Sequence, residues 1–123
     1  DLRFSSSSAV FPETGGPWPE AATGLFPGCS GYGAAKIAAE PEIAASAIPA
    51  AIVRLRSLYA LAAPNPKDIC EIVLAACRDA ASIPAGLTFP MTDVRAAAAF
   101  LTGLPAQSGA SYYNLNRRWK LVP

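Results

Sequence analysis

The pattern of hydrophobic and polar residues predicts several short β-strands along the chain. The segment Ala51–Leu58 is the clearest candidate, because it is rich in apolar residues and β-branched near its start. Leu2–Ser6 and Ser111–Leu115 are further candidates, and a short strand is expected within Ile83–Phe89. A loop is expected over Pro12–Gly31, since its many proline and glycine residues disfavour regular structure.

Apolar residues at helical spacing predict helices between these strands. The first helix is expected to begin at Ser30 or Gly31 and to end near Glu40, where Pro41 marks its boundary. A second helical piece, Glu42–Ser46, is expected to continue beyond a kink caused by the proline.

The second half of the chain predicts two more helices. An amphipathic helix begins at Lys67 or Asp68, and its apolar positions share one face: Ile69, Ile72, Val73, Ala76 and Cys77. The last helix is rich in alanine and runs from Asp93 to about Gly103, with Thr92 as its expected cap. Strands that alternate with helices predict an α/β fold with a parallel sheet and flanking helices.

The composition indicates one folded domain over residues 1–123. Hydrophobic residues make up 52% of the chain and charged residues 15%, which argues against disorder. The formal net charge is only +1, so we expect no nucleic-acid partner and no anionic membrane partner. The longest uncharged apolar run, Ile43–Val53, contains Pro49 and is too short to cross a bilayer.

The absence of histidine removes several kinds of site. Without histidine there is no serine–histidine triad, no cysteine–histidine pair and no histidine-containing zinc site. The cysteines are odd in number and widely spaced, at Cys29, Cys70 and Cys77. We therefore expect no metal site and no disulfide framework, and a reducing cytoplasm as the compartment.

The strongest candidate chemistry is the pair Tyr32 and Lys36, which are four residues apart on the first predicted helix. Residues at this spacing lie above one another on the same face. A free phenol is a poor base at neutral pH because its pKa is near 10, but a neighbouring ammonium stabilises the phenolate. Such a pair can act as a general acid/base near pH 7. The alternative is an ordinary surface contact between two exposed side chains.

The glycines beside this pair do not form a dinucleotide-binding fingerprint. Gly28, Gly31 and Gly33 follow the spacing G-x-x-G-x-G, which is the reverse of that motif. No strand leads into them, and Pro27 precedes them. We interpret the segment as a loop.

A serine cluster upstream changes the interpretation of the tyrosine–lysine pair. Ser7-Ser8-Ala9-Val10-Phe11 is similar to an S-x-x-V-[YF] stretch at the end of a strand. Tyr32, Lys36 and Glu40 are similar to a helix that carries Y-x-x-x-K and a glutamate one turn later. In this order, separated by a proline-rich loop, the two motifs resemble the extended short-chain dehydrogenase/reductase family, also called the NAD-dependent epimerase/dehydratase family.

The resemblance continues in the family's order along most of the chain. Val53-Arg54-Leu55 resembles the next strand of the family, residues 91–96 resemble a helix start, and Tyr113-Asn114-Leu115 resembles a later strand. The N-terminal half of the family carries a glycine-rich loop for the pyrophosphate and an acidic residue for the adenosine ribose. No segment of this sequence resembles either feature. The resemblance therefore implies a partial Rossmann-like parallel sheet that lacks the N-terminal dinucleotide-binding half.

The resemblance also assigns roles to single residues. Tyr32 is implied as the acid/base, Lys36 as the residue that binds the nicotinamide ribose, and Ser7 as the residue that orients the substrate oxygen. Tyr32 and Lys36 are thus implied as cofactor-binding, with NAD as cofactor and NADP as the alternative. Ser7, Ser8 and Ser57 are implied as substrate-binding. Ser8 competes with Ser7 for the catalytic position, but only Ser7 has the S-x-x-V-F register.

Three functions stay open within this resemblance. The segments Ser30–Lys36 and Pro64–Lys67 look like those of sugar-acid dehydrogenases of the D-erythronate dehydrogenase type. A nucleotide-sugar epimerase or dehydratase is the alternative, although such enzymes usually have asparagine near Ser57 and glycine at Ala60. The third function is a non-catalytic fragment that cannot bind cofactor alone.

The domain organisation follows from the same comparison. We expect a single partial domain over 1–123, in which 1–60 holds the catalytic segment and the following strand, and 61–123 holds substrate-side helices and short strands. The chain is expected to be the C-terminal portion of a larger enzyme or an incomplete copy of one. A small sugar-like substrate is implied, and so is a homodimer formed through the Tyr–Lys helix.

Overall fold

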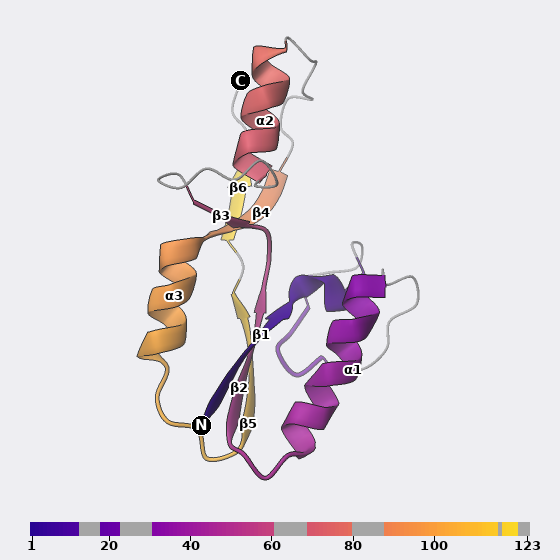
Figure 1. Ribbon diagram of the computed structural model, residues 1–123, viewed down its shortest axis with the longest axis vertical. Coiled ribbons are helices and arrows are strands. Elements are labelled where there is room, and N and C mark those ends of the chain that lie inside the picture. The colour runs from indigo at the N-terminus through magenta and orange to yellow at the C-terminus, as the bar shows by residue number, and fades with distance from the viewer. Residues whose placement is uncertain (13–17, 23–30, 61–68, 80–87, 116, 121–123) are drawn as a thin grey trace.

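A parallel sheet with the strand order β1-β2-β5 forms the centre of the fold (Figure 1). The strands are β1 (Leu2–Ser7), β2 (Ala50–Leu55) and β5 (Ala110–Leu115). In the register, β2 pairs with β1 on one side and with β5 on the other, both in parallel. The α/β class and the parallel sheet predicted from the sequence are confirmed. The computed structural model describes residues 1–12, 18–22, 31–60, 69–79, 88–115 and 117–120.

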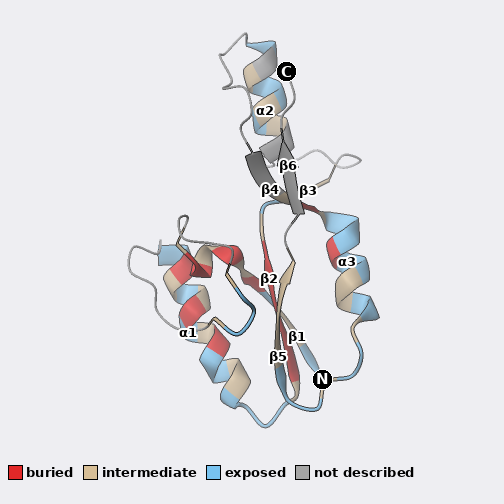
Figure 2. Ribbon diagram, turned by 180° about the vertical axis from the view of Figure 1, so that it is seen from behind, coloured by how far each residue is buried: buried red, intermediate tan, exposed pale blue. Residues whose placement is uncertain are grey.

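Two helices cover the two faces of this sheet. Helix α1 (Gly31–Ala45) lies on one face and α3 (Val94–Gly103) on the other, as Figure 1 shows. Every residue of β2 is buried, because the central strand is covered on both faces. Figure 2 shows this strand as the most continuously buried element of the protein.

The alternation of side chains along β2 divides the core in two. Ala51, Val53 and Leu55 face α3 and form one cluster with Ala97. Phe100 of α3 extends that cluster, where its ring meets the ring of Tyr113 edge-on at 5.8 Å between centroids. This half of the core is entirely apolar in its buried members.

The face toward α1 holds the second cluster. A single 3-10 turn, η1 (Ser8–Val10), follows β1 directly and contributes Val10. Val10 and Phe11 pack against Ile37 of α1, and the ring of Trp18 stacks on Phe11 with centroids 5.8 Å apart. The cluster fixes the first half of α1 beside the end of β1.

A second, smaller sheet has the order β3-β4-β6. Strand β3 (Leu58–Tyr59) pairs in parallel with β4 (Thr88–Asp93), and β4 pairs antiparallel with β6 (Arg117–Lys120). Helix α2 (Ile69–Arg78) lies at the far end of this sheet (Figure 1). Strand β6 was not predicted from the sequence, because three of its four residues are basic and do not form an apolar or β-branched run.

The expected end of the first helix is wrong. α1 does not stop or restart at Pro41 but runs through it to Ala45 as one element. A proline in a helix interior removes one backbone hydrogen bond and costs about 3 kcal/mol. Tertiary contacts offset this cost, because Glu40 is bound to Arg54 of β2 and Ile43 beyond the proline is half-buried.

The expected long strand over 51–58 is in fact two strands in different sheets. β2 ends at Leu55, and β3 begins at Leu58. Between them Ser57 has a positive φ of 28°, in the left-handed region, and this turns the chain from one sheet to the other. The carbonyl of Ser57 accepts a hydrogen bond from the Thr92 amide at 3.1 Å, which anchors the turn to β4.

The expected cap of the last helix is displaced by one residue. Asp93, not Thr92, is the N-cap of α3, and its carboxylate accepts hydrogen bonds from the amides of Arg95 and Ala96. Thr92 belongs to β4, where it is buried and its hydroxyl donates to the Leu115 carbonyl at 3.2 Å. A carboxylate is the better acceptor at the positive end of a helix.

Several expectations fall on residues outside the described ranges. They are the loop over 13–17 and 23–30, the helix start at 67 or 68, and positions 83–87 of the expected short strand. Within the described ranges, no helix combines the length and the apolar character that a membrane span requires.

Candidate functional site

Ser7 stands at the carboxyl end of β1, where the chain turns into η1. Its hydroxyl oxygen accepts a hydrogen bond from the Ala9 amide at 3.1 Å and so caps the turn. A serine hydroxyl that accepts in this way keeps its own proton for donation to another group. Ser7 is therefore held in place by the backbone and still has a donor to offer.

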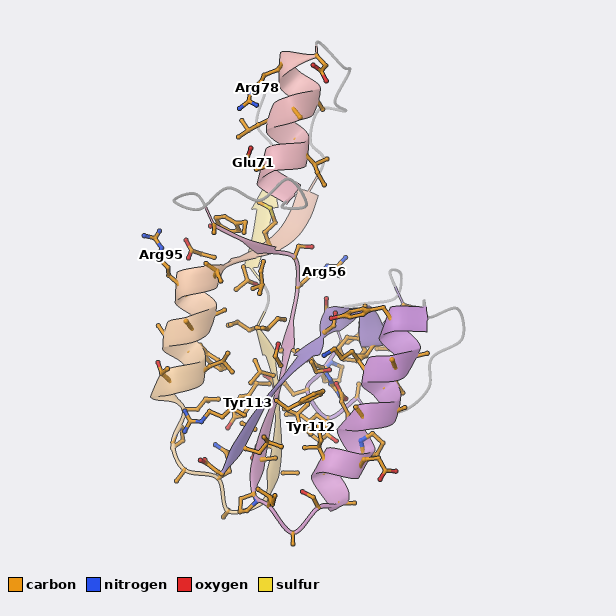
Figure 3. The ribbon with its side chains drawn as sticks, in the orientation of Figure 1. Arg56, Glu71, Arg78, Arg95, Tyr112 and Tyr113 are labelled. Atoms are coloured by element: carbon orange, nitrogen blue, oxygen red, sulfur yellow. The ribbon has the colours of Figure 1, made fainter. Side chains whose placement is uncertain are left out.

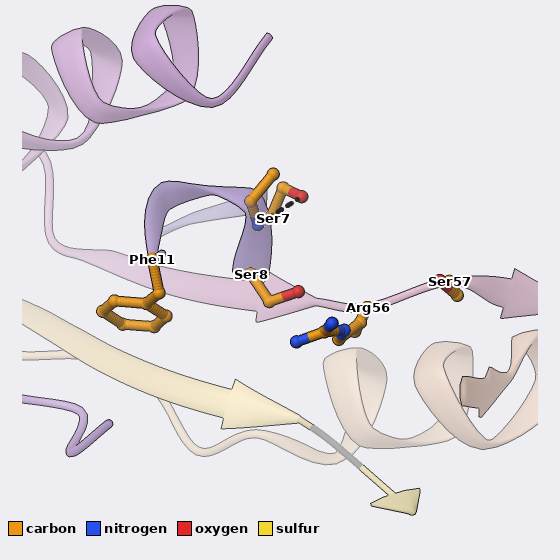
Figure 4. Close-up of a pocket in the computed structure, with 6 residues that line it drawn as sticks. Ser7, Ser8, Phe11, Arg56 and Ser57 are labelled. Carbon is orange, nitrogen blue, oxygen red and sulfur yellow. Dashed lines mark hydrogen bonds between the residues drawn. The ribbon is translucent and has the colours of Figure 1, made fainter. Parts of the chain in front are cut away.

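A pocket of about 190 Å³ opens at this end of the sheet (Figure 4). Its lining residues come from the end of β1, from η1 and from the turn after β2: Ser7, Ser8, Ala9, Phe11, Arg56 and Ser57. Ligands of open α/β sheets bind outside the carboxyl ends of parallel strands. The structure thus brings together all three serines that the sequence predicted as substrate-binding.

Tyr32 and Lys36 lie in the first turns of α1, on the same side of the helix. The Lys36 Nζ is 5.8 Å from the centroid of the Tyr32 ring and 4.9 Å from that of Phe4. It donates a hydrogen bond to the Ser5 carbonyl of β1 at 3.0 Å. Tyr32 itself is 60% exposed, so its ring is accessible to a ligand.

The structure places this pair beside the pocket rather than in it. Among the described residues, neither Tyr32 nor Lys36 belongs to the pocket lining. The two features share β1, because Lys36 is bonded to Ser5 while Ser7 lines the pocket. The helix that carries the pair is thereby tied to the strand that carries the serine.

A buried ionic network joins α1 to the strands β1 and β2. It was not predicted from the sequence. The Arg54 guanidinium of β2 binds both carboxylate oxygens of Glu40 on α1, with Nη2–Oε2 at 2.6 Å and Nε–Oε1 at 3.0 Å. The Ser6 hydroxyl donates to Glu40 Oε1 at 2.6 Å. Arg54 and Glu40 are 1% and 4% exposed, and a buried charge pair of this kind requires such full hydrogen bonding.

Two aromatic rings enclose the Arg54 guanidinium. Its central carbon is 4.8 Å from the ring centroid of Phe11 and 4.8 Å from that of Tyr112, and its Nη1 donates to the Glu20 carbonyl at 3.1 Å. Burial raises the pKa of the Tyr112 phenol, and the Glu40 carboxylate adds to this, while Arg54 opposes it. In Figure 3, Tyr112 points toward α1 and Tyr113 toward α3, as neighbours on a strand do.

Sequence reasoning also missed Arg56, which the structure places in the pocket lining. In Figure 4 the Arg56 guanidinium and the Ser8 hydroxyl lie on the same side of the pocket. A signal existed, since Arg54 and Arg56 are two residues apart and interrupt an otherwise apolar strand. Side chains at that spacing project to the same face.

Within the part of the chain that the structure describes, no group of three or more histidine, cysteine, aspartate or glutamate side chains could hold a metal ion. The polar groups of the candidate site are the hydroxyl groups and the guanidinium of the pocket lining, with the phenol of Tyr32 and the ammonium of Lys36 beside the pocket. These groups can donate hydrogen bonds, transfer a proton and bind an anion.

Comparisons with models of protein families, with curated proteins and with solved structures found no match to this chain.

Proposed function

We propose that this chain is the catalytic segment of an NAD(P)-dependent oxidoreductase that acts on a hydroxyl or carbonyl group of a sugar-acid-like substrate. The observation that carries the proposal is the hydrogen bond from Lys36 Nζ to the Ser5 carbonyl. It holds the helix with Tyr32 and Lys36 against the strand that ends in Ser7. In this proposal Ser7, Tyr32 and Lys36 act together near the carboxyl end of β1, in the roles that hydride transfer in the extended short-chain dehydrogenase/reductase family requires.

The residues present fit the nicotinamide end of such a cofactor. The Lys36 ammonium has three donors and uses one on Ser5, which leaves two for ribose hydroxyl groups. The Tyr32 ring is exposed and open to a ligand. In this proposal the sheet β1-β2-β5 is the second half of a Rossmann-like sheet, and the pyrophosphate is held outside these strands.

Each residue then has one task. Tyr32 moves the proton on or off the substrate oxygen, and the Lys36 ammonium lies 5.8 Å from the centroid of its ring. The Ser7 hydroxyl donates to the same oxygen and orients it, since its position is fixed by the Ala9 amide. The bound nicotinamide supplies or accepts the hydride.

The pocket volume favours a small acid over a nucleotide sugar. A pocket of about 190 Å³ is smaller than the ~300–1,000 Å³ of sites for drug-sized ligands. It has room for a short polyhydroxy acid, whereas a nucleotide sugar needs a longer groove. We therefore propose that the protein is a dehydrogenase rather than an epimerase.

The proposal includes a setting for the protein. We propose a reducing cytoplasm as the compartment, since no disulfide framework is suggested by three widely spaced cysteines. The proposed partners are a small sugar-like substrate and a second copy of the chain, without nucleic acid or membrane.

The test is turnover of the purified protein with short sugar acids and either NAD or NADP. Accumulation of reduced nicotinamide supports a dehydrogenase, whereas isomerised sugar without net reduction identifies an epimerase or dehydratase. The variant Tyr32→Phe should lose turnover, and Tyr113→Phe, on the opposite face of the sheet, should keep it. Calorimetric titration with NAD completes the test, since a protein that neither binds cofactor nor turns over is a non-catalytic fragment.

A further inference from the structure

Arg56 is a cation in the pocket without a counterion among the described residues. The described ion pairs join Arg3 to Asp1, Arg54 to Glu40 and Arg95 to Asp93, and none includes Arg56. Arg56 directly follows the end of β2, is half-buried as a residue and lines the pocket. The guanidinium is therefore not engaged by a described carboxylate and can bind an anion that enters the pocket.

The remaining polar groups of the pocket are hydroxyls that can donate. Ser7 accepts from the Ala9 amide and keeps its proton for a ligand. Ser8 is 8% exposed and faces the same space as Arg56 in Figure 4. Ser57 adds a third hydroxyl at the pocket rim. One guanidinium in the same pocket lining as three hydroxyl groups is the chemistry that recognises an oxyanion.

The pocket lining contains no acidic residue among those described, so its local charge is positive. The planar fork of one guanidinium matches a planar carboxylate through two parallel hydrogen bonds. A phosphate ester shares this chemistry, but with two negative charges it is typically met by further cations. The small volume and the single cation favour the carboxylate.

We propose that Arg56 is the specificity-determining residue of this site and binds the carboxylate of the substrate. The inference rests on the proposed function, in which Ser7 of the same pocket orients the reacting oxygen. It adds the residue that recognises the acid group, through which the pocket selects acids over neutral sugars of the same length. Arg56 is thus a substrate-binding residue that the predicted set of Ser7, Ser8 and Ser57 did not include.

The experiment measures equilibrium binding by calorimetry and kcat/KM in parallel. The probes are a four-carbon aldonate, the neutral alditol of the same length and the corresponding sugar phosphate. The wild type should bind the aldonate more tightly than the other two. Arg56→Gln should weaken aldonate binding at least about tenfold and leave alditol binding unchanged, since hydrogen bonds between two charged groups are lost. Arg56→Lys should restore part of the affinity, and Arg78→Gln, an exposed arginine on α2, should change nothing.

Three outcomes would overturn the inference. They are equal binding of aldonate and alditol by the wild type, undiminished aldonate binding by folded Arg56→Gln, and tighter, Arg56-dependent binding of the sugar phosphate. Urea unfolding establishes whether each variant is folded. If Arg56→Gln does not fold, the binding of aldonate by Arg56→Lys is compared with that of the wild type instead. Arg56-dependent aldonate binding without any reduced nicotinamide supports the inference while it contradicts the proposed function.

Discussion

The Arg54 guanidinium is bound to both carboxylate oxygens of Glu40, 14 residues earlier in the chain, across the buried interface of β2 and α1. The Ser6 hydroxyl of β1 joins the same carboxylate. These three residues stand next to the proposed site: Ser6 precedes Ser7, Glu40 is one turn after Lys36, and Arg54 is two residues before Arg56. The network therefore fixes the relative positions of the three elements that carry the site.

Glu40→Gln is expected to destabilise the protein strongly. It leaves the Arg54 guanidinium buried without a counterion, and breaking a buried pair in this way costs about 3–5 kcal/mol. Glu42→Gln removes an exposed carboxylate from the same helix and should change stability by less than about 0.5 kcal/mol. The free energy of unfolding in urea measures both, and similar values for the two variants would contradict the role of the network.

Tyr112 predicts a loss of stability at alkaline pH. Burial raises its pKa above the ordinary value of 10.0 in the folded protein, so the phenol ionises first in the unfolded chain. This contribution to stability is complete below about pH 10 and is lost as pH rises through the folded-state pKa. Tyr112→Phe should lose less stability than the wild type over that window. Urea unfolding at a series of alkaline pH values measures this, and parallel curves for the two proteins would disprove it.

We expect the stability of the protein to depend strongly on the shape of the side chain at position 57. Its φ of 28° is accessible to glycine without strain, but a β-branched side chain is an outlier there. Ser57→Val should destabilise the protein by about 1–2 kcal/mol, whereas Ser57→Gly should stay within about 1 kcal/mol of the wild type. Thermal and urea unfolding provide the comparison. Ser108→Val, at an exposed loop serine, is the control and should have little effect. A tolerated valine at 57 would show that the turn relaxes.

Lys36→Met separates the chemical role of the lysine from its packing. Methionine keeps an apolar stem near the Phe4 ring but cannot donate to Ser5. Since that hydrogen bond is exposed, stability should change by less than about 1 kcal/mol. Turnover should fall by about 10²–10⁴, the range typical of general acid–base catalysis, because the proposed site loses the donor for the nicotinamide ribose. Measurement of kcat/KM beside the affinity for NAD tests this, and unchanged values of both would remove Lys36 from the site.

Asp93 predicts a loss of stability in acid. Hydrogen bonds from the Arg95 side chain and from the Arg95 amide hold the pKa of the Asp93 carboxyl below its ordinary value of 3.8. Its contribution is therefore complete above about pH 4 and is lost as pH falls through the lowered folded-state pKa. Asp93→Asn keeps an acceptor for the cap but not the charge, so its stability should fall less over that window. Asp79→Asn, at the end of α2, is the control variant, and the helical signal at a series of acidic pH values is the readout.

Much of the fold could be predicted because it is encoded locally. The apolar, β-branched run around Ile52 and Val53 is the buried central strand, and the alanine-rich run after Asp93 is α3. The boundaries that failed were decided by distant residues. Pro41 stays inside α1 because Glu40 is held by Arg54, and no local pattern reveals that partnership.

The candidate site could be predicted only in part, for the same reason. The serine cluster and the tyrosine–lysine spacing predicted Ser7, Tyr32 and Lys36 as candidates, and of these Ser7 lines the pocket. Arg56 joins that lining where the chain turns at Ser57. A charged residue inside a buried apolar strand must be paired, so Arg54 was itself a signal that an acid lay nearby. Which acid it was depended on the packing of α1 against β2.

The register of the parallel sheet has a consequence for the way the chain folds. Residue 2 pairs with residue 50, and residue 50 with residue 110, so every ladder of this sheet joins distant parts of the chain. Such a topology has a high contact order, and the entropy of closing long loops is lost before the strands gain any contact. The helices can form early from local contacts. The sheet can form only after the connection from β1 to β2 and the connection from β2 to β5 have both closed. Loop closure at β2 is therefore the step that we expect to limit the folding rate.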